Sequence, residues 1–546
     1  MLAKIARWIA LHPQSSLAAL TIIILVPFLT KPFNIDDPIF IWGARQIQAH
    51  PADPYGFTVL WDTPSPVPMW KVTQNPPLAS YYIAVAAAIL GWSEIALHAA
   101  FLLPAAAAIW GTCRLAHRFC DRPALATLAA LLTPAFLVSS TSIMCDVPML
   151  AFWVWAMVFW VEGVEERRIY KLFIAGGLAA LAGMTKYFGI CIVPLVAAYS
   201  IAARQPFRIW APPLLIPLAV FCAYQFAFAE LYGTCPLFQA SQYATSHGTT
   251  HFSYPDSFLI GLSFSGGSFA VLFFLFPLLW RNGPCFAFLG FAALGACAVI
   301  LHPGLLDAFK ISEQITTRIQ LAFWVAAGTA VLLLAFVDLI TLPGPKSLLL
   351  FLWILGTFVF AAFLNWTVNA RSLLPMAPAL GMLAARRLEQ NFKGRDFPLR
   401  QISACFAVAA LFAVFAMEAD SLTAFAVRQN VRAIQGAYGQ AVRNMRFEGH
   451  WGFQFYMSRL GGSPVNLTNP QVKPGDLVAA PSNNYLNLPL PFQRKRLLNT
   501  FSQPGPIWLA TVNESLGGCF YGSTLGPLPF VFGQAAPERV FIFTVE

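Results

Sequence analysis

Long apolar runs, separated by short polar segments, recur along most of this chain. A helix needs roughly 20 consecutive apolar residues to cross the hydrocarbon core of a bilayer. About 13 such runs can be drawn, over residues 11–30, 93–113, 123–142, 147–162, 170–185, 187–203, 210–229, 257–280, 284–301, 319–340, 347–364, 371–388 and 401–418. Only 11% of the residues are charged, against about 25% in soluble domains. The sequence therefore predicts a polytopic α-helical membrane protein with about 13 transmembrane helices, and it excludes an ordinary soluble enzyme.

The basic residues predict how these helices are oriented. If the helices cross in alternation, the segments of residues 1–418 on the N-terminal side contain 17 Lys and Arg residues, and the loops of residues 1–418 on the opposite side contain seven. Cytoplasmic loops carry the excess of basic residues in membrane proteins. We therefore expect a multi-pass protein of the plasma (inner) membrane with a cytoplasmic N-terminus and an external C-terminus. The net charge of +10 is spread over these short clusters, so we expect no nucleic acid partner.

Two segments outside the apolar runs are long enough to form structure of their own. Residues 31–92 form an external loop, in which the apolar stretch 78–90 is too short to span and could lie in the membrane interface. Residues 419–546 contain short strand-like pieces between Gly, Pro and Asn turns. We predict a transmembrane domain over residues 1–418 and a small external C-terminal α/β domain over residues 419–546.

Three carboxylates lie next to apolar runs, where a charge is costly and usually has a function. Asp36 and Asp37 follow the first run. Adjacent carboxylates can bind a divalent cation, or one of them can act as a general base; a solvated loop start is the alternative. Asp146 precedes Val147 and Pro148 at the start of a later run, where it could equally be a helix N-cap.

Two cations are predicted on the same side of the membrane as these carboxylates. Lys186 follows an apolar run, and Arg371 opens one. A helix N-terminus disfavours a cation, so we expect Arg371 to have an anionic partner. Snorkelling of both side chains to the interface is the alternative. Lys and Arg hold phosphate groups well, so the five residues together are suited to transfer from a lipid-linked phosphate donor.

Five motifs in this order resemble those of the GT-C glycosyltransferases, in particular the branch of protein O-mannosyltransferases and lipid A aminoarabinose transferases (glycosyltransferase family 39-like). The motifs are Asp36-Asp37 with Phe40 and Ala44-Arg45, Gln74-Asn75-Pro76-Pro77-Leu78 with Tyr81-Tyr82, Asp146, Thr185-Lys186, and Arg371 with Pro375. Three positions depart from the family pattern. Asp37 stands in place of Glu, Asn75 in place of a charged residue or His, and Ser372 in place of an aromatic residue.

The resemblance implies a GT-C-like fold and an active site on the periplasmic or extracellular face. The donor is a sugar on a polyprenyl phosphate, and the acceptor is a lipid, a glycan or a protein; membrane lipids surround both. In this scheme Asp36 is the base for the acceptor hydroxyl in an inverting displacement at the anomeric carbon. Asp37 and Asp146 help to position the acceptor or a divalent cation, which could be Mg²⁺, Mn²⁺ or Zn²⁺.

The same resemblance assigns the substrate-binding residues. Lys186 and Arg371 bind the lipid phosphate, where negative charge grows as the bond to the sugar breaks. Gln74, Asn75 and Tyr82 belong to the motif that contacts substrate. No motif residue falls in residues 419–546, so we expect this segment to cover or shape the acceptor entrance without supplying catalytic groups.

Two other functions fit a polytopic protein with charges at its membrane boundary. A transporter or lipid flippase is the main alternative, but it would be expected to show paired halves with broken helices near the midplane. The sequence has no repeated halves, and its charges are predicted at one face. A structural protein whose C-terminal segment binds a partner is the third possibility. Its function would survive Asp36→Asn.

Overall fold

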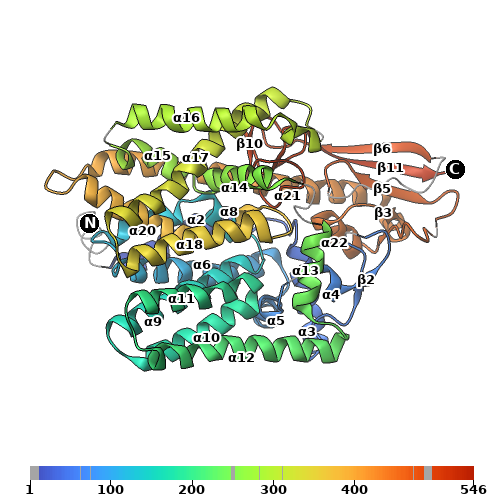
Figure 1. Cartoon of the computed structure of the whole chain (residues 1–546). Coiled ribbons are helices and arrows are strands. Elements are labelled where there is room, and N and C mark those ends of the chain that lie inside the picture. Colours follow the sequence, from blue (N-terminus) through green and yellow to red (C-terminus); the bar gives the residue numbers. More distant parts are fainter. Residues whose placement is uncertain are drawn as a thin grey trace, which may run out of the picture.

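The computed structural model describes residues 12–61, 63–73, 75–247, 252–281, 283–309, 311–470, 472–484 and 495–546. Figure 1 shows a bundle of helices, with the long strands of the C-terminal segment at one end. Seven helical spans are long and apolar enough to cross a membrane. They are α6 (Glu94–Ala116), α9 (Asp146–Glu165), α12 (Phe207–Tyr232), α16 (Pro284–Leu301), α17 (Gln314–Thr341), α18 with η5 (Pro345–Leu364) and α21 with η6 (Leu399–Asn444).

Two further apolar runs fold into bent pairs of helices, which brings the count to nine if each pair is one span. The pair α7 (Pro123–Leu131) and α8 (Pro134–Ser140) bends by 62°, and the pair α14 (Tyr254–Ser268) and α15 (Val271–Leu279) bends by 85°. Pro134 at the first bend has no backbone N–H to continue α7. The Thr133 side chain there accepts a hydrogen bond from the Phe136 N–H and so caps the new helix.

The remaining predicted spans are shorter helices. Those of apolar composition are α2 with η1 (Pro13–Phe28), α5 (Leu78–Leu90), α10 (Ile169–Thr185), and η2 with α11 (Tyr187–Ala202). The other helices are α3 (Asp37–Ala49), α4 (Met69–Val72), α13 (Pro236–His247), η4 (Pro303–Ala308), α19 (Ala370–Leu373), α20 (Met376–Asn391) and α22 (Trp451–Arg459). The protein is therefore a polytopic helical membrane protein, as the sequence predicts. By length and composition, however, only seven to nine of the described helices reach the dimensions of a full span, fewer than the 13 expected.

Helix α21 connects the helical bundle to the C-terminal segment. The sequence predicts a helix that ends at residue 418, but α21 runs without a break from Leu399 to Tyr438 over 40 residues. At 1.5 Å per residue it is about 60 Å long, twice the thickness of the hydrocarbon core. The boundary expected at residue 419 thus lies inside a helix.

The C-terminal segment forms a mixed five-stranded sheet in the order β4-β3-β5-β11-β6. The strands are β3 (Arg446–Phe447), β4 (Ser463–Pro464), β5 (Leu477–Pro481), β6 (Lys495–Gln503) and β11 (Glu538–Val545). Strand β11 pairs antiparallel with β5 and β6, and β3 pairs parallel with β4 and β5. Short two-stranded ladders add β1 (Thr58–Val59) with β2 (Val67–Pro68), β7 (Leu509–Ala510) with β10 (Val531–Phe532), and β8 (Val512–Asn513) with β9 (Gly518–Cys519). The expected α/β character is confirmed.

The part of the C-terminal segment that lies between β6 and β11 in sequence packs against the helical bundle. The Gln320 side chain of α17 donates to the carbonyl oxygen of Phe532 and accepts from its N–H, at 3.1 and 2.7 Å. The Phe530 ring packs edge-on against Trp324, with centroids 5.3 Å apart. This part of the chain is therefore integrated with the helices.

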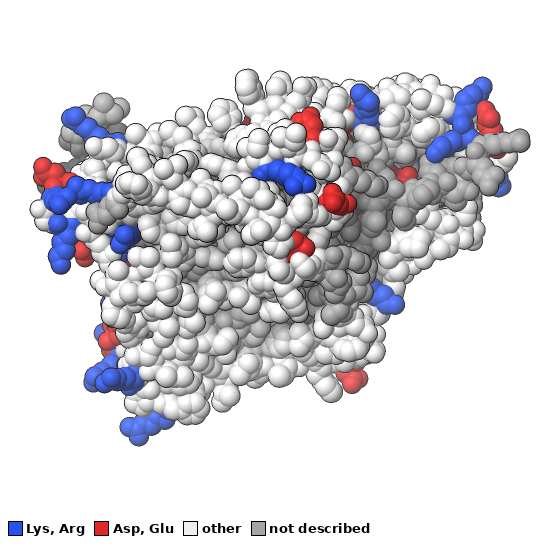
Figure 2. All heavy atoms as spheres, turned by 45° about the horizontal axis from the view of Figure 1, so that its top comes forward, with Lys and Arg blue, Asp and Glu red and all other residues white. Residues whose placement is uncertain are grey.

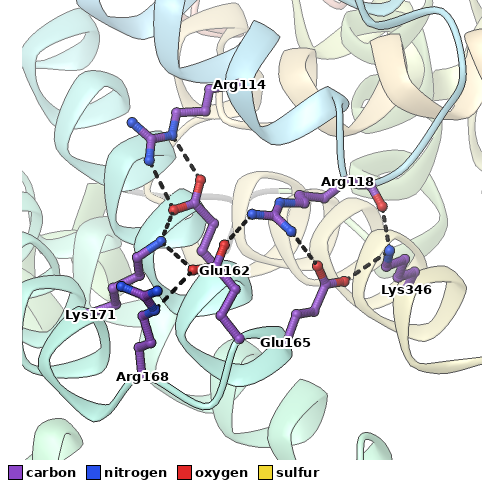
Figure 3. Close-up of polar contacts among 8 residues, drawn as sticks. Arg114, Arg118, Glu162, Glu165, Arg168, Lys171 and Lys346 are labelled. Carbon is purple, nitrogen blue, oxygen red and sulfur yellow. Dashed lines mark hydrogen bonds and ion pairs between the residues drawn. The ribbon is translucent and has the colours of Figure 1, made fainter.

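Charged residues lie at one end of the molecule and from its middle toward the other end, with a broad band of uncharged atoms between the two groups (Figure 2). At one end, a network joins α6, α9, α10 and α18 (Figure 3). Glu162 accepts from Arg114 Nε and Nη2 at 2.8 and 2.9 Å and from Lys171 Nζ at 2.5 Å. Lys346 pairs with Glu165 at 2.9 Å. These cations belong to the segments predicted as cytoplasmic, and the network lies near the C-terminal end of α9.

Candidate active site

A cavity of about 810 Å³ lies where several helix ends meet the C-terminal segment. Four of the five charged residues singled out from the sequence line it: Asp36, Asp146, Lys186 and Arg371. Asp146 is the first residue of α9, so the cavity and the network of Figure 3 lie at opposite ends of that helix. For its 20 residues the separation is roughly 30 Å. The cavity is therefore at the end of the bundle opposite the predicted cytoplasmic clusters.

Local structure explains how these side chains reach one place. Asp36 directly precedes α3, whose first turn contains Pro38. Helices α9 and α10 form a hairpin, which brings Asp146 at the start of α9 close to Lys186 just after the end of α10. Arg371 lies in α19, which begins with a cap in which the Asn369 side chain accepts from the Ser372 N–H at 2.7 Å.

The four residues form a chain of alternating charges. Asp36 Oδ2 lies 2.9 Å from Arg371 Nη2. Arg371 Nη1 lies 3.9 Å from Asp146 Oδ2, and Asp146 Oδ1 accepts from Lys186 Nζ at 2.6 Å. The anionic partner expected for Arg371 is thus Asp36, with Asp146 on its other side. Asp146 makes no side-chain N-cap and serves instead as the partner of Lys186.

The exposed fraction of the side chain differs among these four residues. The Asp36 side chain is 28% exposed, whereas that of Asp146 is 3% exposed. Arg371 and Lys186 fall between these values. The buried Nε of Arg371 has no hydrogen-bond partner among the described residues, so this guanidinium retains a free donor. Asp36 is therefore the carboxylate most accessible to a molecule in the cavity.

Asp37 lies behind the cavity wall and is almost fully buried. Its two oxygens accept the Asn34 N–H at 3.0 Å and the Ile143 N–H at 2.8 Å. Burial raises the pKa of this carboxyl to about 6, although Lys31 and the two N–H donors act in the opposite direction. These contacts attach the start of α3 to the segment that precedes α9, and so they hold Asp36 close to Asp146.

The predicted metal ligands, Asp37 and Asp146, do not form a donor set for a divalent cation. The Asp37 oxygens accept backbone N–H groups, and each Asp146 oxygen faces a cationic side chain. Across the residues that the structure describes, no group of three or more His, Cys, Asp or Glu side chains is placed to hold a metal ion. A hard cation usually takes six or more oxygen ligands. Lys186 and Arg371 occupy the positions next to Asp146 that such an ion would need.

The three remaining substrate-binding candidates are placed differently. Asn75 lines the cavity, and its backbone oxygen accepts from the Tyr55 hydroxyl at 2.8 Å. Gln74 lies outside the described residues. Tyr82 does not line the cavity, because its hydroxyl donates to the Ala100 carbonyl oxygen at 2.6 Å in the contact between α5 and α6. Its role in substrate binding therefore stays a prediction.

The C-terminal segment reaches farther into the site than the sequence suggests. Tyr521 lines the cavity, together with Cys519, Gly522 and Thr524. The Tyr521 ring lies 5.2 Å from the Arg371 guanidinium carbon. In the sequence, Tyr521 follows Phe520 in a Gly-rich stretch without a charged neighbour, and only the fold brings it to Arg371.

Aromatic side chains extend from the charged part of the cavity toward the membrane-facing helices. Tyr254, Phe360 and Phe363 line the cavity. A neighbouring groove of about 330 Å³ runs between α14, α17 and α18 and is lined almost entirely by apolar side chains. Phe258 of this groove stacks on Phe363, with centroids 6.5 Å apart. A long apolar chain could therefore leave the charged cavity along this path.

Residues 74–227 match the model of a family described as dolichyl-phosphate-mannose-protein mannosyltransferase. The match contains Asn75, Asp146 and Lys186, whereas Asp36 and Arg371 lie outside it. It confirms the resemblance drawn from the motifs over this part of the chain. No curated protein matches the chain.

Several solved structures are similar. The oligosaccharyltransferase of Archaeoglobus fulgidus, crystallised with a tethered acceptor peptide, matches with a TM-score of 0.46 at 13% identity, over 84% of this chain and 64% of that one. This chain thus spans less than two thirds of the archaeal protein. ArnT from Cupriavidus metallidurans bound to undecaprenyl phosphate matches with a TM-score of 0.40 at 14% identity, over 87% of this chain and 93% of that one. Its apo form gives a TM-score of 0.43 at 15% identity, over the same shares.

Proposed function

We propose that this protein is an integral-membrane glycosyltransferase that moves a sugar from a polyprenyl-phosphate donor to a lipid, glycan or protein acceptor. The observation that carries the proposal is the alternating chain Asp36–Arg371–Asp146–Lys186 along one cavity, with one accessible carboxylate. The family described for residues 74–227 acts, by its name, with dolichyl-phosphate mannose. The reaction takes place on the periplasmic or extracellular side, at the end of the bundle opposite the basic clusters.

Each charged group has a part in the transfer. Asp36 accepts the proton of the acceptor hydroxyl while the acceptor oxygen bonds to the anomeric carbon of the sugar. The bond between that carbon and the phosphate oxygen breaks, and the polyprenyl phosphate leaves with the electron pair. Arg371 and Lys186 stabilise the negative charge that grows on the phosphate.

Asp146 and Asp37 support this reaction from more buried positions. Asp146 lies between the two cations and keeps both side chains directed at the same place. Asp37 holds the segment that carries Asp36. Because the donor set does not fit a divalent ion, Lys186 and Arg371 balance the phosphate charge in this proposal, and no step depends on a metal.

The apolar groove between α14, α17 and α18 receives the polyprenyl chain. It begins next to the aromatic wall of the cavity, where Phe258 of the groove stacks on Phe363 of the cavity. Apolar walls suit this ligand, since burial of a hydrocarbon chain contributes roughly 0.8 kcal/mol per methylene group. The phosphate then lies at the charged end and the chain along the membrane-spanning helices.

The test is transfer by the purified protein in lipid nanodiscs. A panel of polyprenyl-phosphate sugars, each labelled in the sugar, is incubated with lipid, glycan and peptide acceptors. We expect one donor to lose its label to one acceptor class, with release of free polyprenyl phosphate. Lys186→Ala should reduce this transfer, whereas a substitution at the opposite end, such as Arg167→Ala, should not. Movement of an intact donor across the bilayer without cleavage would identify a flippase and overturn the proposal.

A further inference from the structure

The C-terminal residues 520–523 pair with the backbone directly before Arg371. The Ala370 N–H donates to the Phe520 carbonyl oxygen at 3.1 Å, and the Ser523 N–H donates to the Val368 carbonyl oxygen at 2.8 Å. The Ser523 and Thr367 hydroxyls lie 3.0 Å apart. These bonds join two segments about 150 residues apart in sequence, and they fix the backbone from which Arg371 projects.

Tyr521 contacts Arg371 in two ways. Its ring lies 5.2 Å from the guanidinium carbon, which is within the range of a cation–π interaction. Arg371 Nη2 also points at the Tyr521 carbonyl oxygen at 3.5 Å. The ring therefore limits the orientations open to the guanidinium group, which meets the Asp36 carboxylate in the cavity.

Asp420 of α21 holds Tyr521 in this place. Its Oδ2 accepts from the Tyr521 hydroxyl at 2.8 Å, and its Oδ1 accepts from the Thr511 hydroxyl at 3.0 Å. Burial, together with the Asp420 charge, raises the pKa of the Tyr521 phenol well above its usual range. The hydroxyl therefore stays protonated and acts as a donor at physiological pH.

Lys31 connects Asp420 to the segment that carries Asp36. Its Nζ lies 2.5 Å from Asp420 Oδ2 and donates to the Thr141 hydroxyl at 3.1 Å. Lys31 and Asp420 are almost fully buried. Replacing only one member of a buried ion pair is strongly destabilising, because it leaves the other charge unpaired. Lys31 lies five residues before Asp36, so this pair links the segment that carries the proposed base to Tyr521.

We propose that Tyr521 is a positioning residue for Arg371 in the donor-phosphate site, held there by Asp420 and Lys31. The C-terminal segment is then part of the donor site as well as a cover for the acceptor entrance. This inference rests on the proposed function, because it takes the phosphate of a polyprenyl phosphate as the ligand of Arg371.

The test compares two substitutions of the same residue. Tyr521→Phe keeps the ring over Arg371 and loses only the hydroxyl, whereas Tyr521→Leu removes the ring. We expect Tyr521→Leu to raise the donor KM about tenfold with kcat within about threefold of the parent, since one lost cation–π contact in a desolvated site amounts to roughly a factor of ten in binding. Tyr521→Phe should restore most of the donor affinity, and the acceptor KM should stay unchanged in both variants.

Tyr456 supplies a matched control. It is another mostly buried tyrosine of the C-terminal segment, and its hydroxyl donates to Glu94 at 2.7 Å outside the cavity. Tyr456→Leu should lower the melting temperature without raising the donor KM. A general loss of packing would change both leucine variants alike.

A second measurement does not depend on turnover. Undecaprenyl phosphate without a sugar is titrated against the full-length protein, and tryptophan fluorescence reports binding. Weaker binding by Tyr521→Leu, with Tyr521→Phe near the parent, supports the inference. Equal affinity in a folded Tyr521→Leu protein overturns it. If the parent binds undecaprenyl phosphate but transfers no sugar from any donor, the proposed function fails while the phosphate site stands.

Discussion

Arg371 Nη2 and Asp36 Oδ2 lie 2.9 Å apart, although 335 residues separate them in sequence. The pair joins the proposed base to the proposed phosphate site. Asp36 is the more exposed partner, at 28% against 14% for Arg371. Under the proposed function, we expect a donor phosphate that binds Arg371 to compete with Asp36 for the guanidinium group. Such competition would release the carboxylate to meet the acceptor and would couple donor binding to base activation through one side chain.

The first prediction concerns Asp36. Asp36→Asn keeps the shape of the side chain but removes the proton acceptor. Transfer should fall by about 10²–10⁴ in kcat, while the affinity for undecaprenyl phosphate is retained or increases, because Arg371 loses the nearer of its two anionic partners. Transfer is measured with labelled donor, and affinity is measured by titration with the free lipid phosphate.

Asp396 provides the control for this substitution. It is an exposed carboxylate between α20 and α21, so Asp396→Asn should leave both kcat and affinity unchanged. Near-normal turnover of Asp36→Asn would remove Asp36 from the role of base.

The second prediction distinguishes the two cations. Arg371 faces Asp36 with one nitrogen and Asp146 with another, and a lysine cannot reproduce that planar geometry. Arg371→Lys should therefore weaken donor binding even though the charge is kept. Lys186 acts as a point charge next to Asp146, so Lys186→Arg should be tolerated better than Arg371→Lys. The donor KM of the two variants is the measurement.

Both variants need a check of folding, since each replaces a partner of the mostly buried Asp146. Melting temperatures in detergent show whether a change in KM reflects the site alone. Equal donor KM values for the parent, Arg371→Lys and Lys186→Ala would contradict the phosphate assignment even if transfer itself were observed.

The third prediction concerns orientation in the membrane. Helix α21 is long enough to carry the chain from one side of a bilayer to the other. A reporter inserted after Asp396 and one fused after Glu546 should therefore report opposite sides, with the reporter after Glu546 external. Fusion inside α21 near Asp420 should be avoided, because it would break the buried pair with Lys31. Two reporters on the same side would contradict the orientation.

The sequence predicted the helices and the charged residues of the cavity for identifiable physical reasons. Apolar runs and alternating basic segments follow from the cost of polar groups in a bilayer. A charge beside an apolar run needs a partner, which is why Arg371 could be expected to meet an anion. Which anion Arg371 meets depends on tertiary structure. The local sequence pattern therefore did not predict that its nearest partner is Asp36.

Other features could not be read from the sequence. Asp36 and Asp37 are neighbours with the same chemistry, yet one lines the cavity and the other accepts two backbone N–H groups behind it. The last apolar run ends at residue 418, so the sequence did not predict that α21 continues to Tyr438. A change to polar composition marks the membrane boundary and does not mark the end of a helix. Tyr521 contacts Arg371 although the two residues are 150 positions apart in sequence. No local sequence pattern predicts such a contact.

The last prediction concerns Glu538 on β11, which is almost fully buried. Burial raises the pKa of its carboxyl from 4.5 to about 7, although the Asn483 side chain donates to Oε1 at 2.6 Å. The folded state thus holds the proton more tightly than the unfolded state. The stabilisation is fully present below about pH 4.5 and is lost as the pH rises through about 7. Glu538→Gln, which is neutral at every pH, should remove this dependence and make the protein more stable than the parent at pH 8 by up to about 3 kcal/mol. Melting temperatures from pH 4 to 8 measure the effect, with the exposed Glu514→Gln as the control that keeps the parental profile. Parallel profiles for the parent and Glu538→Gln would show that this carboxyl does not titrate in that range.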